Sequence, residues 1–564
     1  MIFTENKFYC ILCLLTAAFF SGATASAQTT ERSRITTLPS PTPVATPKPL
    51  PTVSPTPSPA ATPPSTVPPA TLQTLSELQA NIRRVLQNPL LARGQVGVKI
   101  VSLDANTLVF AQNDDKYFMP ASNMKAFTMA AALARLTPDF RFVTSVYAVN
   151  KPDAAGAIRG DLRVYGRGDP TFAASLNDGD YYKAINALAD KIAASGLKRV
   201  EGSLVGDVSY FSGDALGATW EWDDLQWYYG AGVSALTIND NAVDLKILPG
   251  ATAGAPCVVQ ILPFNGLFSV NNACQTVAAN GKREPEVKKR LGSNTLDVGG
   301  TMPAGDAKGY AGAIAVENPA QMFVYLLKNA LAQKGVTITG QNKIIGAQDK
   351  RQNAITQANS PTNEGNNIVA LPGVEITRLE SVPLSEIAAK TLKPSQNLYT
   401  ELVVRALGEE VGDKTDLRKP SAERGLEVVQ KFLAEAGIAS DAVVQFDGSG
   451  LSRHNLITPA ATVQLYTFMS RHRFSAPFNA ALPIGGVDGT LKNRFQNSLA
   501  ANNVRAKTGT IDGVSSLSGY VTTASGERLV FSILVNNLPD ATLRRETIDN
   551  IAVQLANFNG KTTR

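Results

Sequence analysis

The spacing of apolar residues predicts the elements that begin the folded chain. Residues 72–91 carry apolar side chains at helical spacing, which predicts a first helix. Two short runs follow, at 96–103 and 107–112, and the turn residues between them predict two strands. A largely apolar segment then runs from Pro120 to Leu136, with Pro138 just beyond its end, which predicts a well-marked helix.

The C-terminal end shows a different periodicity. Residues 504–510, 517–523 and 528–536 alternate between apolar and polar positions and are joined by Asp-Gly and Ser-Gly turn signals. They predict an antiparallel meander, and residues 542–558 predict a closing helix. Strands and helices at both ends indicate one α+β domain, an antiparallel sheet flanked by helices.

The middle of the chain is predicted to be an insertion into that domain. We expect residues 72–144 and 374–564 to form the two-part domain, and 145–373, rich in glycine, short strands and turns, to form β-rich accessory structure in two subdomains. A length of 564 residues with 44% apolar content is sufficient for two to four cores.

The first 71 residues are expected to lie outside the folded part. Residues 1–27 contain Lys7, an apolar run of about 13 residues and a small-residue end, which indicates a secretory signal cut before Gln28. The alternative is an uncleaved anchor, but the run is shorter than the roughly 20 residues that span a bilayer. Residues 28–71 are proline-rich and predict an extended spacer. We expect no transmembrane helix after signal removal.

Charge and cysteine content narrow the choice of function. The 53 basic and 47 acidic residues are scattered without long runs, so we expect no nucleic acid partner. Cys257 and Cys274 remain after the signal, and in an oxidising compartment they form either a disulfide or two free buried thiols. Two histidines and two distant cysteines give no cluster of metal ligands, so we expect no metal site. The sequence also lacks a glycine-rich phosphate-binding loop after a strand, so we expect no nucleotide cofactor.

Candidate chemistry begins at the helix of residues 120–136. The chain has only two histidines, His454 and His472, so few residues could serve in a Ser-His-Asp triad. A hydrolase with this sequence would therefore use another base. Ser122 and Lys125 are three apart and share a helix face. Burial on an apolar helix favours the neutral lysine, which can accept a proton from serine. Alone, such a pair occurs by chance in most proteins of this size, and a helix-capping serine is the alternative interpretation.

Two further segments complete a catalytic pattern. Ser395 and Asn397 open a predicted helix that runs to Gly408, and Lys507-Thr508-Gly509 lies on the first strand of the meander. With Ser122 and Lys125 they give Ser-x-x-Lys, Ser-x-Asn and Lys-Thr-Gly in chain order, the motif set of penicillin-binding proteins and class A β-lactamases. Singly, Ser395 would be a helix cap and Lys507 a solvated strand residue.

The motif set assigns a task to each group. Ser395 and Asn397 relay protons and hold the substrate backbone, while Lys507 and Thr508 bind the free carboxylate of a terminal D-alanine. Gly509 is expected to let the substrate lie against the strand. The backbone amides of Ser122 and Thr510 would form the oxyanion hole.

At residues 75–560 the chain resembles the class C low-molecular-mass penicillin-binding proteins. Besides the three motifs, the resemblance rests on Leu136–Phe142, Gly168–Thr171, Trp220–Asp224, Asp447–Arg453 and Gly486–Leu491. It implies a penicillin-binding/β-lactamase-like transpeptidase domain, and D-Ala-D-Ala carboxypeptidase or D,D-endopeptidase activity on peptidoglycan stem peptides. It also implies covalent inhibition by β-lactams and a periplasmic or other extracytoplasmic location. The separation of 273 positions between Ser122 and Ser395 distinguishes it from class A β-lactamases.

The resemblance further implies a subsite for the substrate side chain. Asp169 and Arg453 would line a pocket for the charged end of a diaminopimelate-type residue. After Lys-Thr-Gly, the family is not uniform, and Asp512 here places an acid where some members have a neutral residue.

Two other functions remain open on the sequence. A β-lactamase or esterase requires fast deacylation, but no counterpart of the deacylating glutamate of class A β-lactamases can be placed, so we expect a long-lived penicillin adduct. A catalytically idle peptidoglycan-binding protein is opposed by the intact motif residues Ser122, Lys125, Ser395, Asn397 and Lys507.

Overall fold

The computed structural model describes residues 72–563 except 265, 348–372 and 417. The predicted signal (1–27) and spacer (28–71) therefore lie outside the described residues. Among the helices of the described ranges, none is long and apolar enough to cross a membrane.

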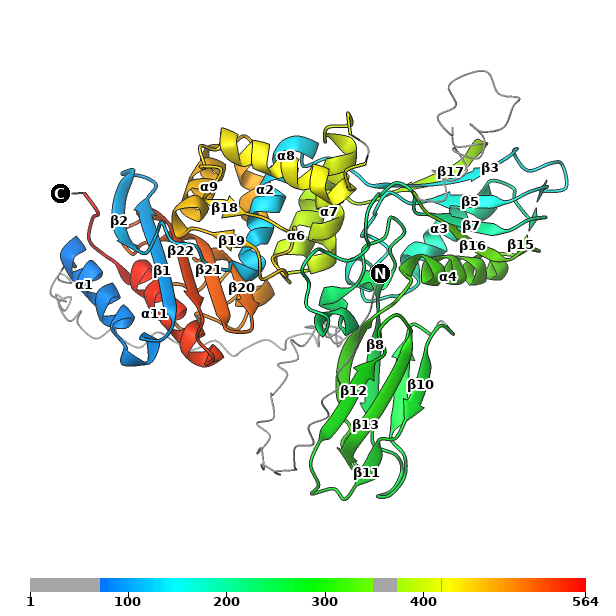
Figure 1. The fold of residues 1–564 in the computed structure, drawn as a ribbon, viewed down its shortest axis with the longest axis horizontal. Helices are drawn as coiled ribbons and strands as arrows, with labels where there is room; N and C mark the ends of the chain where they lie inside the picture. The colour runs from blue at the N-terminus through cyan, green and yellow to red at the C-terminus, as the bar shows by residue number, and fades with distance from the viewer. Residues whose placement is uncertain (1–71, 265, 348–372, 417, 564) are drawn as a thin grey trace, which may run out of the picture. The chain divides into compact units, whose positions relative to one another are not determined.

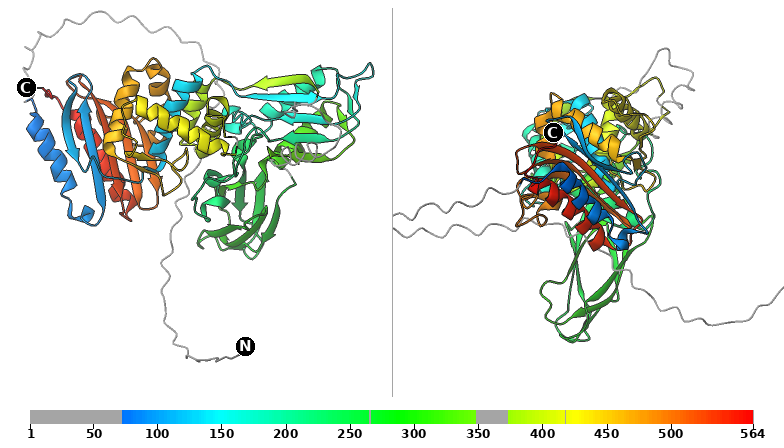
Figure 2. Two further views of the ribbon diagram at one scale, coloured as in Figure 1. Left: turned by 45° about the horizontal axis from the view of Figure 1, so that its top comes forward. Right: turned by 90° about the vertical axis from the view of Figure 1, so that its left-hand side faces the viewer.

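The main sheet is assembled from both ends of the chain, as the alternating runs predicted. Its five strands are antiparallel throughout, in the order β2-β1-β22-β21-β20. Figure 2 shows the early strands beside the C-terminal ones. Their bounds are β1 (Gln95–Ser102), β2 (Thr107–Gln112), β20 (Arg505–Ile511), β21 (Val514–Thr522) and β22 (Arg528–Asn536).

Strand alternation gives this sheet two buried faces. On β22, Leu529, Phe531, Ile533 and Val535 join one core, while Val530 and Leu534 join the other. The first core is covered by α1 (Leu75–Leu86) and α11 (Ala541–Asn557). The second is covered by α2 (Met124–Leu136), α6 (Leu384–Leu392), α7 (Asn397–Glu410), α8 (Ser421–Glu435), α9 (Pro459–Arg471) and α10 (Ser475–Ala481). The α+β class expected from the sequence is confirmed.

The helix expected from Pro120 begins as a tighter turn. Ala121–Asn123 form the 3-10 turn η2, and α2 begins only at Met124. Ala121 has a left-handed φ of 47°, and its carbonyl lies so close to Gly450 that a Cβ there would be 1.8 Å away. The loop at Gly450 thus packs directly against the turn that carries Ser122, and only glycine permits this approach.

The insertion contains a second five-stranded sheet, in the order β16-β7-β5-β3-β17. Its strands are β3 (Val143–Ala148), β5 (Leu162–Tyr165), β7 (Leu204–Asp207), β16 (Asn342–Ile345) and β17 (Val374–Glu380), with α3 (Lys183–Ala194) and α4 (Pro319–Gln333) in the same core. We expected the insertion to lie between 145 and 373. Strand β17 lies beyond that boundary yet pairs with β3, so this sheet extends to Glu380. A strand whose partner is distant in sequence carries no local signal of its sheet.

Three short strands and a β-rich portion complete the insertion. The short strands are β4 (Ala157–Ile158), β6 (Arg199–Val200) and β15 (Thr337–Ile338). The β-rich portion comprises β8 (Ala242–Leu248), β9 (Val258–Leu262), β10 (Ser269–Asn272), β11 (Gln275–Val277), β12 (Glu284–Lys289), β13 (Thr295–Pro303) and β14 (Tyr310–Ala315). One further hairpin, β18 (Val443–Val444) with β19 (Leu456–Ile457), belongs to the C-terminal half.

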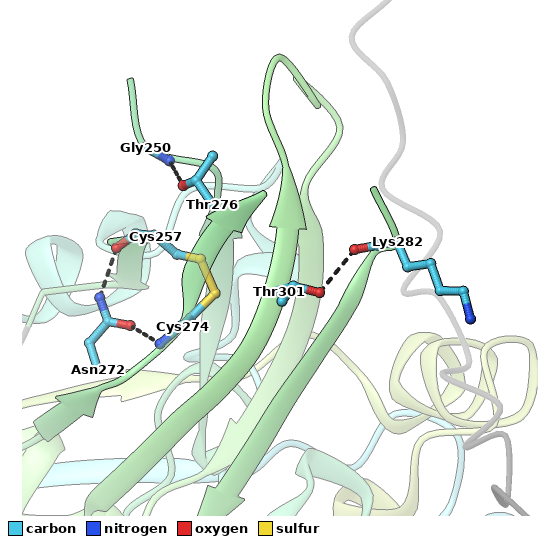
Figure 3. Close-up of a disulfide and its surroundings, with 7 residues drawn as sticks. All are labelled: Gly250, Cys257, Asn272, Cys274, Thr276, Lys282 and Thr301. Carbon is cyan, nitrogen blue, oxygen red and sulfur yellow. Dashed lines mark hydrogen bonds between the residues drawn. A yellow bond between two sulfur atoms is a disulfide. The ribbon is translucent and has the colours of Figure 1, made fainter. Parts of the chain in front are cut away.

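A disulfide joins Cys257 and Cys274 in the β-rich portion, with the two Cα atoms 5.3 Å apart. Figure 3 shows Asn272 beside it, and its amide donates to the carbonyl of Cys257 (2.7 Å) and accepts from the N–H of Cys274 (3.2 Å). Of the two alternatives left open by the sequence, the structure has the bridge.

Candidate active site

Ser122 and Lys125 lie together as the helix spacing predicted, and Asn397 joins them from α7. The Nζ of Lys125 is 2.7 Å from Ser122 Oγ, 2.6 Å from Asn397 Oδ1 and 2.8 Å from the carbonyl oxygen of Ser449. The amide oxygen and the carbonyl can only accept hydrogen bonds. A neutral lysine has two N–H groups and one lone pair, so these two acceptors take both N–H groups and leave the lone pair facing Ser122.

The orientation of the Asn397 amide is set by the insertion. Its Nδ2 donates to the carbonyl of Tyr229 at 2.8 Å, which directs Oδ1 toward Lys125. Tyr229 lies in the 3-10 turn η5 (Tyr228–Gly230), which precedes β8. The insertion therefore contributes a backbone carbonyl that orients Asn397 of the Ser-x-Asn motif. Sequence reasoning missed this contact because a main-chain oxygen leaves no residue signature.

Lys125 is fully buried. Burial lowers the pKa of its ammonium group to about 7, although the negative charges of Asp447 and Glu401 act in the opposite direction. Near neutral pH a substantial fraction of Lys125 is therefore the free base. The lowered pKa agrees with the expectation that burial on the apolar helix favours the neutral form of Lys125.

Lys507 approaches the same site from β20. Its Nζ donates to Ser395 Oγ at 2.9 Å and to the carbonyl of Thr508 at 2.7 Å. Burial, followed by the positive charge of Lys125, holds the pKa of Lys507 well below its usual range. Ser395, two residues before α7 begins, has a left-handed φ of 66°, a conformation that non-glycine residues rarely adopt.

Strand β20 is the edge strand of the main sheet. Arg505 forms a bridge with Ile484 and the N–H of Ala506 donates to the carbonyl of Pro483, so an extended ligand would pair with the part of the edge beyond these residues. Thr508 donates from its hydroxyl to that of Thr490 at 2.7 Å, and Thr510 is exposed. A Cβ on Gly509 would lie 2.5 Å from the carbonyl of Pro120 and 3.1 Å from Ser122 N. Gly509 therefore lets β20 approach the turn that carries Ser122, and its expected role of leaving room for substrate stays a prediction.

The two residues assigned to a side-chain subsite occupy different environments. Asp169 is buried at 1% exposure, and its Oδ1 accepts from the N–H (2.8 Å) and hydroxyl (2.6 Å) of Thr171. Its Oδ2 has no hydrogen-bond partner in the described chain, and burial raises the pKa of this carboxyl to about 6. The Asp-Pro-Thr sequence is thus an Asx-type turn, whose aspartate bonds its own backbone.

Arg453 contacts a different acidic residue. Its guanidinium pairs with Glu221 at 2.8 Å and donates to the carbonyl of Asp512 at 2.9 Å. Among the ion pairs of the described residues, none joins Arg453 to Asp169. The acidic partner of Arg453 therefore comes from the Trp220–Asp224 segment, while the expectation that Asp169 and Arg453 line one side-chain subsite stays a prediction.

The same segment is bound to the catalytic half at a second point. The indole of Trp220 donates to Asp447 Oδ2 at 2.9 Å. Next to it, burial and the charges of Asp223 and Glu221 raise the pKa of Asp224 to about 6. Although the sequence marked this segment as a family motif, it did not reveal which residues it contacts.

Comparisons with known proteins agree with this arrangement. A model of the D-Ala-D-Ala carboxypeptidase 3 (S13) family matches residues 78–558. The D-alanyl-D-alanine carboxypeptidase of Actinomadura sp. (strain R39) is 33% identical over 497 residues, which are 86% of this chain and 86% of that protein. The D-alanyl-D-alanine carboxypeptidase DacB of Haemophilus influenzae is 26% identical over 459 residues, 80% of this chain and 87% of the relative.

Solved structures are similar in fold. Penicillin binding protein 4 from Haemophilus influenzae has a TM-score of 0.69 at 23% identity, covering 85% of this chain and 100% of that chain. The same protein complexed with a β-lactam has a TM-score of 0.64 at 22% identity, covering 84% and 98%. At this level of identity the likeness shows a shared architecture.

Proposed function

Because the chain belongs to the D-Ala-D-Ala carboxypeptidase 3 (S13) family, we propose that it is a serine-type D-alanyl-D-alanine carboxypeptidase whose acyl group is carried by Ser122. It is a class C low-molecular-mass penicillin-binding protein. One observation carries the assignment of the nucleophile: Lys125 Nζ lies 2.7 Å from Ser122 Oγ and within hydrogen-bond distance of two acceptors, Asn397 Oδ1 and the Ser449 carbonyl. In the neutral amine these two acceptors take both N–H groups, which leaves the lone pair for the serine proton.

The first chemical step is acylation of Ser122. Neutral Lys125 takes the hydroxyl proton while Oγ attacks the carbonyl carbon of the penultimate D-alanine. The N–H groups of Ser122 and Thr510 stabilise the oxyanion. The C–N bond then breaks, the terminal D-alanine leaves with a proton delivered through Ser395, and water later hydrolyses the acyl-enzyme.

Recognition of the peptide end is assigned to β20. A terminal carboxylate beside Lys507 and Thr508 would receive charge-assisted hydrogen bonds. In the ligand-free site the pKa of Lys507 is held well below its usual range by burial. A bound carboxylate favours the ammonium form, so substrate binding and protonation of Lys507 are linked.

A subsite for the substrate side chain is proposed at Arg453 and Glu221. The two side chains form an ion pair, and Asp224 lies close enough to be influenced by the charge of Arg453. A diaminopimelate-type side chain ends in an amine and a carboxylate, which such a mixed-charge surface can bind through one of each.

Peptidoglycan stem peptides and cross-bridges are the proposed substrates, and β-lactams the covalent inhibitors. The related Haemophilus influenzae protein has been solved with a β-lactam. A β-lactam amide is cyclic, so its leaving amine stays tethered after Ser122 attacks. We propose a periplasmic or other extracytoplasmic location, supported by the predicted signal and the Cys257–Cys274 disulfide.

The experiment is release of D-alanine from a peptide ending in D-Ala-D-Ala, measured for the mature chain, Ser122→Ala and Ser518→Ala. Ser518 is a buried serine of the same sheet, bonded to Ser532 at 2.9 Å, and serves as the matched control. We expect Ser518→Ala to release D-alanine and Ser122→Ala to release none. D-Alanine release by Ser122→Ala at the rate of the parent would contradict the assignment.

A further inference from the structure

The carbonyl of Ser449 is one of two acceptors that hold the catalytic base, and its position depends on buried carboxylates. The peptide between Ser449 and Gly450 accepts from Lys125 Nζ through its oxygen (2.8 Å) and donates through its N–H to Asp447 Oδ1 (2.7 Å). This segment has no helix or strand to fix it. Its geometry therefore rests on side chains that bind its backbone.

Glu401 binds the preceding part of the same loop. Its Oε1 accepts from the N–H groups of Gly448 and Ser449, each at 2.9 Å, and the side chain is 2% exposed. Glu401 lies on α7 one turn after Asn397, so both residues project from the same helix face. One helix thus positions both N–H acceptors of Lys125, one directly through Asn397 and one through the loop that Glu401 holds.

A simple ion pair with Arg405 does not account for this placement. The closest contact between the two side chains is 3.5 Å, longer than either bond from Glu401 to the loop. The guanidinium also donates to the carbonyl of Asp214 at 3.1 Å. A buried ion pair is seldom more stable than an apolar replacement, so a carboxylate kept here points to a role other than stability.

We propose that Glu401 is a positioning residue of the acylation step, which fixes the Ser449 carbonyl against Lys125 and so keeps the lone pair of the base directed at Ser122. The proposal rests on the assignment of Ser122 and Lys125 as nucleophile and base. Glu401 contacts neither the serine nor the lysine by hydrogen bond; it acts through the backbone of Gly448 and Ser449.

The charge of Glu401 has a second effect on the same lysine. The charged groups that act on Lys125 are Asp447 and Glu401, which raise its pKa, and Lys507, which lies nearby with a like charge. Burial and then the charge of Asp447 raise the pKa of Glu401 itself to about 7, whereas Arg405 lowers it. Removing the carboxylate charge therefore lowers the pKa of Lys125 and moves the pH at which acylation rises toward lower values.

The test compares Glu401→Ala and Glu401→Gln with matched changes at Glu409. Glu409 lies on the same helix and its carboxylate bonds to buried Arg424, but it has no contact with the loop or with Lys125 in the described structure. Each variant is treated with penicillin, and the second-order rate of adduct formation is measured from pH 5.5 to 9 together with the melting temperature.

We expect Glu401→Ala to slow acylation by about tenfold or more, since a misplaced reacting group is costly even when the chemistry is intact. Glu401→Gln keeps an oxygen acceptor for the two N–H groups, so it should recover much of the rate, with its pH midpoint shifted downward. The Glu409 variants should change the melting temperature alone.

The proposal is overturned if both Glu401 variants acylate at the parent rate with the parent midpoint, or if the Glu409 variants slow acylation to the same extent. A cavity of about 940 Å³ borders Glu401 and Arg405 and gives the arginine access to water once its partner is removed. If Glu401→Ala fails to fold, the acylation rate and pH midpoint of Glu401→Gln test the proposal instead. Absence of an adduct on the parent chain would instead contradict the proposed function itself.

Discussion

The lysine side chains of Lys125 and Lys507 are both fully buried, but the charged groups around them differ. Lys125 lies on α2 near two buried carboxylates, Asp447 and Glu401, which partly offset its desolvation. Lys507 lies on β20, where the charge of Lys125 adds to the effect of burial. In the proposed mechanism, Lys125 is a base with a pKa of about 7, and Lys507 is a group that becomes charged when the substrate carboxylate binds. Neighbouring charge, rather than residue type, separates the two roles.

The largest effect should come from Lys125→Met, which keeps an unbranched side chain of similar length and removes the proton acceptor. We expect penicillin acylation to slow on the order of a thousandfold, the usual scale for loss of a general base. Stopped-flow or mass measurements of adduct formation check this, with the melting temperature as the control for folding. A loss of less than tenfold would assign the base elsewhere.

A smaller and more selective effect is expected from Lys507→Met. Loss of a charged hydrogen-bond donor to a carboxylate costs about 1.5–3 kcal/mol, or roughly ten- to a hundredfold in kcat/KM. Release of D-alanine from a peptide with a free carboxylate should fall, whereas the slow turnover of the matching C-terminal amide should change little. Equal losses on both peptides would remove Lys507 from carboxylate recognition.

The pH dependence of acylation tests the role of Lys125 as the base. Lys125 reacts as the free base, which forms above its pKa, so acylation should rise with pH around a midpoint of about 7. Rates of adduct formation between pH 5.5 and 9 provide the measurement. A rate that is constant over this range would show that deprotonation of Lys125 does not limit the reaction.

The smallest effect on chemistry is expected from Cys257→Ser with Cys274→Ser. The bridge closes a loop between residues 17 apart, and its loss costs about 3 kcal/mol of stability in the insertion on the chain-entropy estimate. Acylation of Ser122 should be unchanged while the melting transition of the insertion shifts downward. An altered acylation rate would mean that the β-rich portion influences the site, although Tyr229, the residue of the insertion that bonds Asn397, lies outside it.

Prediction from the sequence succeeded where side chains carry the information. The motif residues Ser122, Lys125, Ser395, Asn397 and Lys507 do converge, because helix and strand periodicity fix the faces on which they lie. The main sheet was predictable for the same reason, since its two-residue alternation spans both ends of the chain.

Prediction failed where the backbone makes the contact. The carbonyls of Tyr229 and Ser449 orient Asn397 and Lys125, yet any residue could supply them. A motif marks position and not direction, so the sequence could not foresee that Asp169 Oδ1 bonds its own turn. The pairing of β17 with β3 was missed since the two strands are far apart in the chain.

The most direct test of the account is the intact mass of the mature chain after incubation with penicillin, compared with that of Ser122→Ala. The account predicts one stable adduct of the mass of penicillin on the parent, mapped to the peptide that contains Ser122, and none on the variant. An adduct that persists on Ser122→Ala, or its absence from a folded parent, would contradict the central claim that Ser122 is the acylated nucleophile.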